Sequence, residues 1–190
     1  MPMENIKQQL SDVVHHWTAI AMITLFMFSV NPAPAIALTQ APTAKQVAIK
    51  AQEVKKETLA KFSNTAYKGS DKMTDGELVK LLSAVGFTGN ALKTAWAIAK
   101  RESQGRPLAY NGNRKTGDSS YGIFQINMLG NLGTVRKEKF NLRSNVLLFD
   151  PVINAEITYH MTKGGKDWSA WKGLTPKAKE WLKRFPNVRL

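Results

Sequence analysis

The feature that most constrains this chain is one predicted helix, TGNALKTAWAIAKRES, which runs from Thr88 to Ser103. Thr88 is of the type that caps a helix start, and Gly105 and Pro107 follow its end. At about 100° per residue, one side of this helix is apolar. That side holds Ala91, Leu92, Ala95, Ile98 and Ala99. Such a stripe faces a core, so the rest of the chain has to pack around this helix.

One carboxylate, Glu102, falls in the middle of the apolar side. Apolar surroundings and the negative end of the helix dipole both disfavour an ionised carboxylate and raise its pKa. Lys100 and Arg101 are expected to oppose this effect only weakly, because they point away from that side. A carboxylic acid that keeps its proton near neutral pH is what general acid catalysis requires. The alternative is that the helix frays at Ser103 and Glu102 reaches water.

Composition limits the chemistry that is open to this chain. Its 190 residues suffice for one domain with an extension, and it has no cysteine, which excludes disulfides and thiolate metal sites. The three histidines form no ligand cluster, so no metal and no other cofactor is predicted. The net charge is +13, and residues 1–37 carry −1 of it, so the remainder carries +14. This charge favours a polyanionic partner, but without a recognised nucleic-acid-binding motif a nucleic acid is not predicted.

The N-terminal segment resembles an export signal. Residues 17–30, WTAIAMITLFMFSV, form a fourteen-residue apolar run, shorter than the roughly 20 residues of a membrane span. Two small-x-small sites follow, so cleavage is expected after Ala35 or Ala37. The leading residues hold one lysine and two acids, which is unusual for a signal, and an uncleaved anchor that contacts a membrane through residues 17–30 is the alternative. We therefore expect export to the periplasm or cell envelope.

The remaining sequence divides into an arm and a main domain. Residues 1–37 are expected to form the signal peptide or anchor, residues 38–71 a basic helical arm and linker, and residues 72–190 the main domain. Within that domain, a capping box at Thr74–Glu77, the pair Asp150-Pro151 and the pair Thr175-Pro176 each predict a helix start. The polar stretch 110–120 followed by YGIFQINM predicts a small β-hairpin. Residues 130–144 are basic and fit no element.

The order of these motifs resembles a known family. Ala97-Ile-Ala-Lys-Arg-Glu-Ser103 followed by Tyr121-Gly-Ile-Phe-Gln-Ile-Asn127 is similar to the soluble lytic transglycosylase domain of the lysozyme superfamily. The resemblance covers about residues 74–173. It implies an α+β fold, mostly α: a lysozyme-like helical domain with one small β-hairpin. It also implies a peptidoglycan-cleaving enzyme without a cofactor, whose partner is the glycan strand; the oligomeric state stays open.

The resemblance also implies site residues. Glu102 matches the catalytic acid of that family, which cuts the MurNAc–GlcNAc β-1,4 bond with one acid/base glutamate and leaves 1,6-anhydro ends. The expected substrate-binding residues are Ser103, Tyr121, Gln125, Asn127, Tyr159, Trp168 and Trp171. From the residue types alone, Asn111 is a further candidate for hydrogen bonds to the sugar. The aromatic residues also fit a core role, and the two amides also fit a role in tying up hairpin backbone.

One departure from the pattern keeps alternatives open. In animal-type lysozymes, which the stretch 117–127 also resembles, the second catalytic carboxylate stands where this chain has Ser120. Asp118 shares a strand face with Ser120 and is a possible second carboxylate, although a turn residue that bonds its own loop is the simpler interpretation. A retaining hydrolase needs two carboxyl groups. The alternatives are therefore a lysozyme-type hydrolase of the same bond and a non-catalytic wall-binding or virion structural module.

Overall fold

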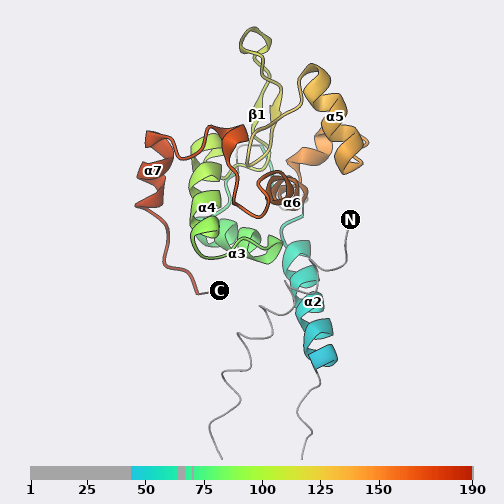
Figure 1. Cartoon of the computed structure of the whole chain (residues 1–190), viewed down its shortest axis with the longest axis vertical. Coiled ribbons are helices and arrows are strands. Elements are labelled where there is room, and N and C mark those ends of the chain that lie inside the picture. Colours follow the sequence, from blue (N-terminus) through green and yellow to red (C-terminus); the bar gives the residue numbers. More distant parts are fainter. Residues whose placement is uncertain (1–43, 64–66, 70, 190) are drawn as a thin grey trace, which may run out of the picture. The chain divides into compact units, whose positions relative to one another are not determined.

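The computed structural model describes residues 44–63, 67–69 and 71–189 (Figure 1). The predicted signal segment, residues 1–37, lies outside the described residues, so its export role stays a prediction. The chain divides into two compact units, residues 1–52 and 53–190. Helix α2, Ala44–Ala60, begins in the first unit, and most of its described side chains are exposed. No described helix has both the length and the apolar content needed to cross a membrane.

The second unit is mostly helical with a small antiparallel sheet, as the sequence predicts (Figure 1). The sheet has three strands in the order β1-β2-β3, one more than the expected hairpin. Residues 130–144, which fitted no predicted element, contain a helix. The elements are α3 Asp75–Val85, α4 Gly89–Ser103, β1 Tyr110–Asn111, η2 Arg114–Thr116, β2 Ser120–Tyr121, β3 Ile126–Asn127, α5 Gly130–Phe140, η3 Asn145–Phe149, α6 Pro151–Met161, η4 Ser169–Trp171 and α7 Pro176–Leu182.

The predicted helix starts follow from local chemistry. The Thr74–Glu77 capping box is complete, because the Thr74 side chain accepts from the Glu77 amide and the Glu77 carboxylate accepts from the Thr74 amide. Asp150 caps α6 through Oδ1, which accepts from the amides of Val152 and Ile153. The expected cap of α4 is wrong in one respect: Thr88 stands at the N-cap position but makes no side-chain capping bond.

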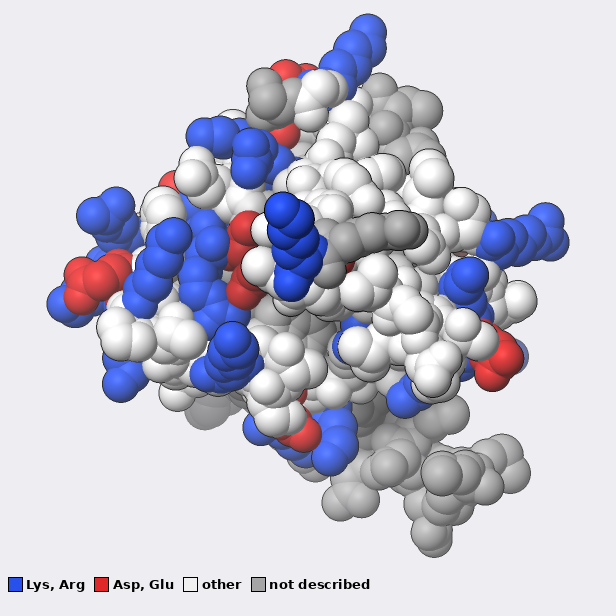
Figure 2. Space-filling model, turned by 90° about the horizontal axis from the view of Figure 1, so that it is seen from above, with Lys and Arg blue, Asp and Glu red and all other residues white. Residues whose placement is uncertain are grey.

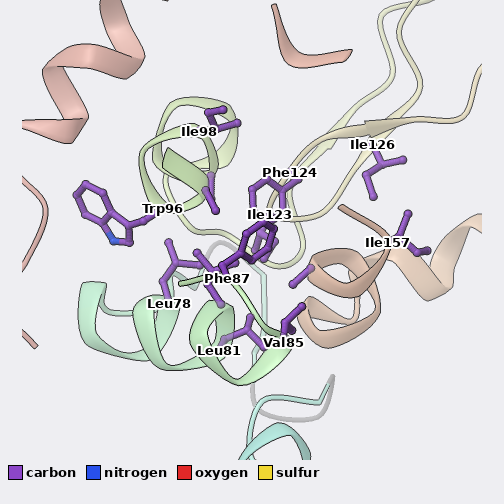
Figure 3. Packing of buried hydrophobic residues seen from close by; sticks show 14 of the residues in the cluster. Leu78, Leu81, Val85, Phe87, Trp96, Ile98, Ile123, Phe124, Ile126 and Ile157 are labelled. Carbon is purple, nitrogen blue, oxygen red and sulfur yellow. The ribbon is translucent and has the colours of Figure 1, made fainter. Parts of the chain in front are cut away.

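Helix α4 contributes several fully buried side chains to the core (Figure 3). Trp96 and Ile98 of α4 are fully buried, and the same core cluster includes apolar side chains of α3, of the segment after β2 and of α6. Trp96 makes edge-to-face contacts with Trp181 of α7 and Phe185, at ring-centroid distances of 6.0 and 5.5 Å. Burying these faces removes apolar surface from water and holds α7 against α4.

The raised pKa of Tyr67 predicts that the folded unit loses stability at alkaline pH. Burial and the nearby negative charge of Glu77 raise the pKa of Tyr67 from 10.0 to about 12. A group whose pKa is raised on folding stabilises the fold below its unfolded pKa, and that contribution is lost as the pH rises toward the folded value. We expect the unfolding free energy to fall between pH 10 and about 12. Urea denaturation should show a shallower fall over that pH range for Tyr67→Phe; an unchanged slope would contradict this assignment.

Candidate active site

A cleft of about 520 Å³ opens beside the C-terminal end of α4. The end of α4, the three-stranded sheet, α5, Met161 of α6 and the segment 170–175 contribute its walls. Of the residues singled out in the sequence, Glu102, Asn111, Asp118, Gln125, Asn127 and Trp171 line this cleft. The structure therefore brings the expected acid, both amides and one of the two tryptophans to one concave surface.

Arg101 contacts Glu102 directly, so the expectation that Arg101 points away is wrong. Its Nε donates to Glu102 Oε1 at 2.9 Å, and its Nη2 forms a short hydrogen bond to the same oxygen. The side chains of Arg101 and Glu102 are 10% and 25% exposed. The described residues offer no hydrogen-bond donor to the second oxygen, Oε2. Glu102 thus presents one held oxygen and one unengaged oxygen at the cleft.

The remaining donors of Arg101 bind the segment 171–175, which contributes Trp171, Lys172 and Thr175 to the cleft lining. Nη1 donates to Gly173 O and Thr175 Oγ1, both at 3.1 Å, and Nη2 donates to Trp171 O at 2.8 Å. A guanidinium has five N–H donors. The two hydrogen bonds to Glu102 and the three to residues 171–175 together use all of them. Arg101 therefore fixes the Glu102 carboxylate and the residues 171–175 relative to each other.

Ser103, expected near the substrate, is a structural residue here. It is 2% exposed, and its hydroxyl donates to Ile123 O at 2.8 Å while accepting from the Gly105 amide at 3.1 Å. Ser103 does not line the cleft. Its contact joins the end of α4 to the loop between β2 and β3.

The loop between β2 and β3 depends on Gly122 and Asn154. Gly122 has φ +74°, and a Cβ there would lie 2.2 Å from Leu148 O, so only glycine fits. Asn154, fully buried on α6, donates through Nδ2 to Tyr121 O and Leu148 O, both at 2.9 Å, and accepts through Oδ1 from the Phe124 amide at 3.0 Å. One amide thereby satisfies three backbone groups and sets the position of the loop.

Gln125 occupies a strained backbone position at the cleft. Its φ is +50°, which is uncommon for a residue with a side chain. Its Nε2 donates to Ala109 O at 3.0 Å and Gly122 O at 2.9 Å, while its Oε1 has no donor among the described residues. Asn127, by contrast, uses its side chain on the protein: Nδ2 donates to Gly117 O, and Oδ1 accepts from the Leu129 and Ser119 amides. Of these two cleft amides, Gln125 is therefore the one whose acceptor oxygen is not used by a described residue.

Asp118 lines the same cleft but is engaged in its own turn. Its Oδ2 accepts from Thr116 Oγ1 at 2.8 Å, and its Oδ1 lies 3.5 Å from Ser120 Oγ. Among the described residues, no lysine or arginine forms an ion pair with it. Its contacts agree with the predicted turn residue, although its side chain also lines the cleft.

The expected aromatic residues are distributed between cleft and core. Trp171 lines the cleft, and its Nε1 donates to Phe124 O at 2.7 Å. Trp168, 9% exposed, packs in the core against Phe87 and Phe124 and does not line the cleft. Tyr159 also packs against Phe87, with ring centroids 4.9 Å apart, and does not line the cleft. The structure does not bring these last two residues to the site.

Tyr121 packs between Tyr110 and Phe149 at ring-centroid distances of 5.0 and 5.4 Å. The Ser119 hydroxyl is 3.3 Å from the Tyr121 hydroxyl, and this hydrogen bond is the largest cause that lowers the pKa of Tyr121. Tyr121 is therefore placed to support the sheet, and it does not line the cleft.

Three residues at or beside the cleft were missed by the sequence argument: Arg136, which lines it, Asn154, which holds its loop, and Arg101 in its actual orientation. Arg136 lies in the basic stretch that fitted no predicted element, and the partners of Asn154 are distant in sequence. No metal centre emerges either, since the described residues contain no group of three or more acidic or histidine side chains arranged to hold an ion.

Comparison with protein families agrees with this arrangement. Residues 79–173, half of the 190-residue chain, match the lysozyme-like domain family. The chain belongs to that family. Searches of curated proteins and of solved structures gave no significant match. The matched range contains α4 and the sheet, and it reaches the segment that Arg101 holds, so the lysozyme-like domain carries the cleft. Membership indicates cleavage of peptidoglycan glycan strands in general.

Proposed function

We propose that this lysozyme-like domain is a lytic transglycosylase that uses Glu102 as its single acid and base. The observation that carries the proposal is the contrast between the two cleft carboxylates. Glu102 has one oxygen that accepts no hydrogen bond from the described residues, whereas both oxygens of Asp118 lie within hydrogen-bond distance of hydroxyl groups of its own turn. One available carboxyl group suits a reaction that needs no second one.

In the proposed reaction, Glu102 donates a proton through Oε2 to the glycosidic oxygen, and the bond from that oxygen to C1 of the muramic acid breaks. The N-acetyl group of the same sugar stabilises the cation that forms at C1. The ionised Glu102 then takes the proton of the sugar's 6-hydroxyl, whose oxygen closes onto C1. Atoms balance without water, and the product has a 1,6-anhydro end.

Arg101 supports the second half of this reaction. After proton donation Glu102 is an anion, and two guanidinium N–H groups already point at its Oε1. Charge-assisted hydrogen bonds of this kind stabilise a carboxylate more strongly than neutral ones. Because the contact involves only one oxygen, Oε2 keeps access to the sugar. Gln125 Oε1 and the face of Trp171 are the further groups we assign to glycan binding.

A lysozyme-type hydrolase of the same bond is the second candidate, because Asp118 lines the same cleft as Glu102. Mass spectrometry of muropeptides released from purified peptidoglycan separates the two reactions. We expect anhydro products, each one water lighter than the corresponding reducing product. Reducing ends alone would establish the hydrolase, and binding to peptidoglycan without any released product would establish a non-catalytic wall-binding module.

Export is part of the same proposal, since the substrate lies outside the cytoplasm. It is supported by the apolar run at residues 17–30 and by the small residues that follow it. Mass spectrometry of the protein recovered from the cell envelope tests this part. We expect a mass that lacks residues 1–35 or 1–37, and an intact N-terminus would favour the anchor.

A further inference from the structure

Arg136 is a cation of the cleft that forms no ion pair with a carboxylate in the described part of the chain. It lies on α5, is partly buried and lines the same cleft as Glu102. Its Nη1 forms a short hydrogen bond to Asn127 O of β3. This bond anchors the guanidinium to the sheet, so the side chain has a defined position in the cleft wall.

The donors of Arg136 are only partly used. Nε and Nη2 have no acceptor among the described residues, and none of the four ion pairs found there includes Arg136. Burial lowers the pKa of Arg136 below its ordinary value, which means that the guanidinium has lost water without gaining an opposite charge. An arginine nevertheless stays charged, so an anion that enters the cleft would offset this loss.

The other charges of the cleft leave Arg136 available. Arg101 is committed to Glu102 and to the segment 171–175. Lys172, also in the lining, is exposed. Asp118 is the one cleft carboxylate that no described cation pairs with, and it lies beyond ion-pair distance of Arg136. On the face seen in Figure 2, lysine and arginine side chains predominate over acidic ones, which favours approach of an anionic polymer.

We propose that Arg136 binds a carboxylate group carried by the muramic acid residues of the glycan strand. This inference rests on the proposed function and specifies its substrate as a strand with acidic substituents. The carboxylate belongs either to the free lactyl group or to the peptide attached to it. A planar guanidinium with two adjacent free N–H donors suits such a group, because it can bind both oxygens in parallel.

The test uses three forms of one glycan: strands that carry peptides, strands stripped of peptides by an amidase, and stripped strands whose lactyl carboxyls are converted to neutral amides. Affinity for each fluorescently labelled strand is measured by anisotropy with the full chain, and every protein compared also carries Glu102→Gln so that no strand is cut. For Arg136→Gln we expect affinity about tenfold weaker on at least one carboxylate-bearing form, and unchanged on the neutral form. The affinity of Arg136→Lys for the carboxylate-bearing forms should lie between that with Arg136 and that of Arg136→Gln. Lysine keeps the positive charge but cannot bind both carboxylate oxygens in parallel.

The matched control is Arg143→Gln, which removes one exposed arginine outside the cleft and should bind all three forms as the wild type does. An effect on peptide-bearing strands alone identifies a peptide carboxylate, and an effect on stripped strands identifies the lactyl group. Equal weakening on the neutral form, or no weakening on any form, would overturn the proposal. Because binding is measured without cleavage, a chain that binds but does not cut would contradict the proposed function and leave this result standing.

Discussion

Glu102→Gln is expected to slow glycan cleavage by at least about 100-fold, because the amide can neither donate the proton to the leaving oxygen nor accept one from the 6-hydroxyl. The amide keeps the shape of the side chain and can still accept from Arg101, so the fold should persist. The measurement is release of soluble muropeptides from purified peptidoglycan, with circular dichroism to establish that the variant is folded.

Two companion variants make this result specific. Glu138→Gln removes an exposed carboxylate on α5 outside the cleft and should cut at the wild-type rate. Asp118→Asn should retain the anhydro products if Glu102 acts alone, whereas a hydrolase that uses two carboxyl groups would lose its activity. Full activity in a folded Glu102→Gln protein would remove Glu102 from the mechanism.

Asn154→Leu is expected to lower the free energy of unfolding by about 3 kcal/mol or more, because it leaves two carbonyls and one N–H without their partner. These groups belong to Tyr121, Leu148 and Phe124, which surround the close approach of Gly122 to Leu148. Leucine has a similar size, so the expected loss comes from hydrogen bonds and not from an empty volume. Urea denaturation followed by tryptophan fluorescence measures it.

Asn154→Asp is the informative companion, since its carboxylate can accept from Phe124 but cannot donate to the two carbonyls. It should also be strongly destabilised. Asn90→Leu, at an exposed position of α4, is the control and should change stability by less than about 0.5 kcal/mol. A loss below about 1 kcal/mol for Asn154→Leu would contradict the role assigned to this amide.

The helices could be predicted from the sequence where their starts carry local chemistry. The capping box at Thr74 and the proline that follows Asp150 act within a few residues, so their geometry is set before tertiary packing. The apolar stripe of α4 likewise identified its core-facing side, because the spacing of these residues is a local property of the sequence. Helix α5 lacks these features: Gly133 is its only buried residue, and a Cβ there would lie 2.2 Å from Met128 O, a packing constraint that the sequence does not display.

The candidate site was predicted less completely than the helices. Its key contacts are made by the ends of long side chains and between residues that are far apart in the sequence. Viewed along the helix axis, Arg101 lies away from Glu102. That view gives the direction of the Cβ atoms, however, and the arginine side chain is long enough for its guanidinium to reach Glu102. The amide of Asn154 meets partners as far as 33 residues away. Tyr159 and Trp168 were assigned by resemblance, and the structure uses both to bury Phe87.

The contacts of α7 show that the folded unit extends beyond the range matched by the family. The family match stops at residue 173, yet Thr175 holds Arg101, and Trp181 and Phe185 cover the fully buried Trp96. At the other end the match begins inside α3 and omits Met73, which is 2% exposed. A recombinant fragment trimmed to the matched range would present an indole to solvent and invite aggregation. Because Phe62 is also buried in the core, expression should span at least residues 62–188.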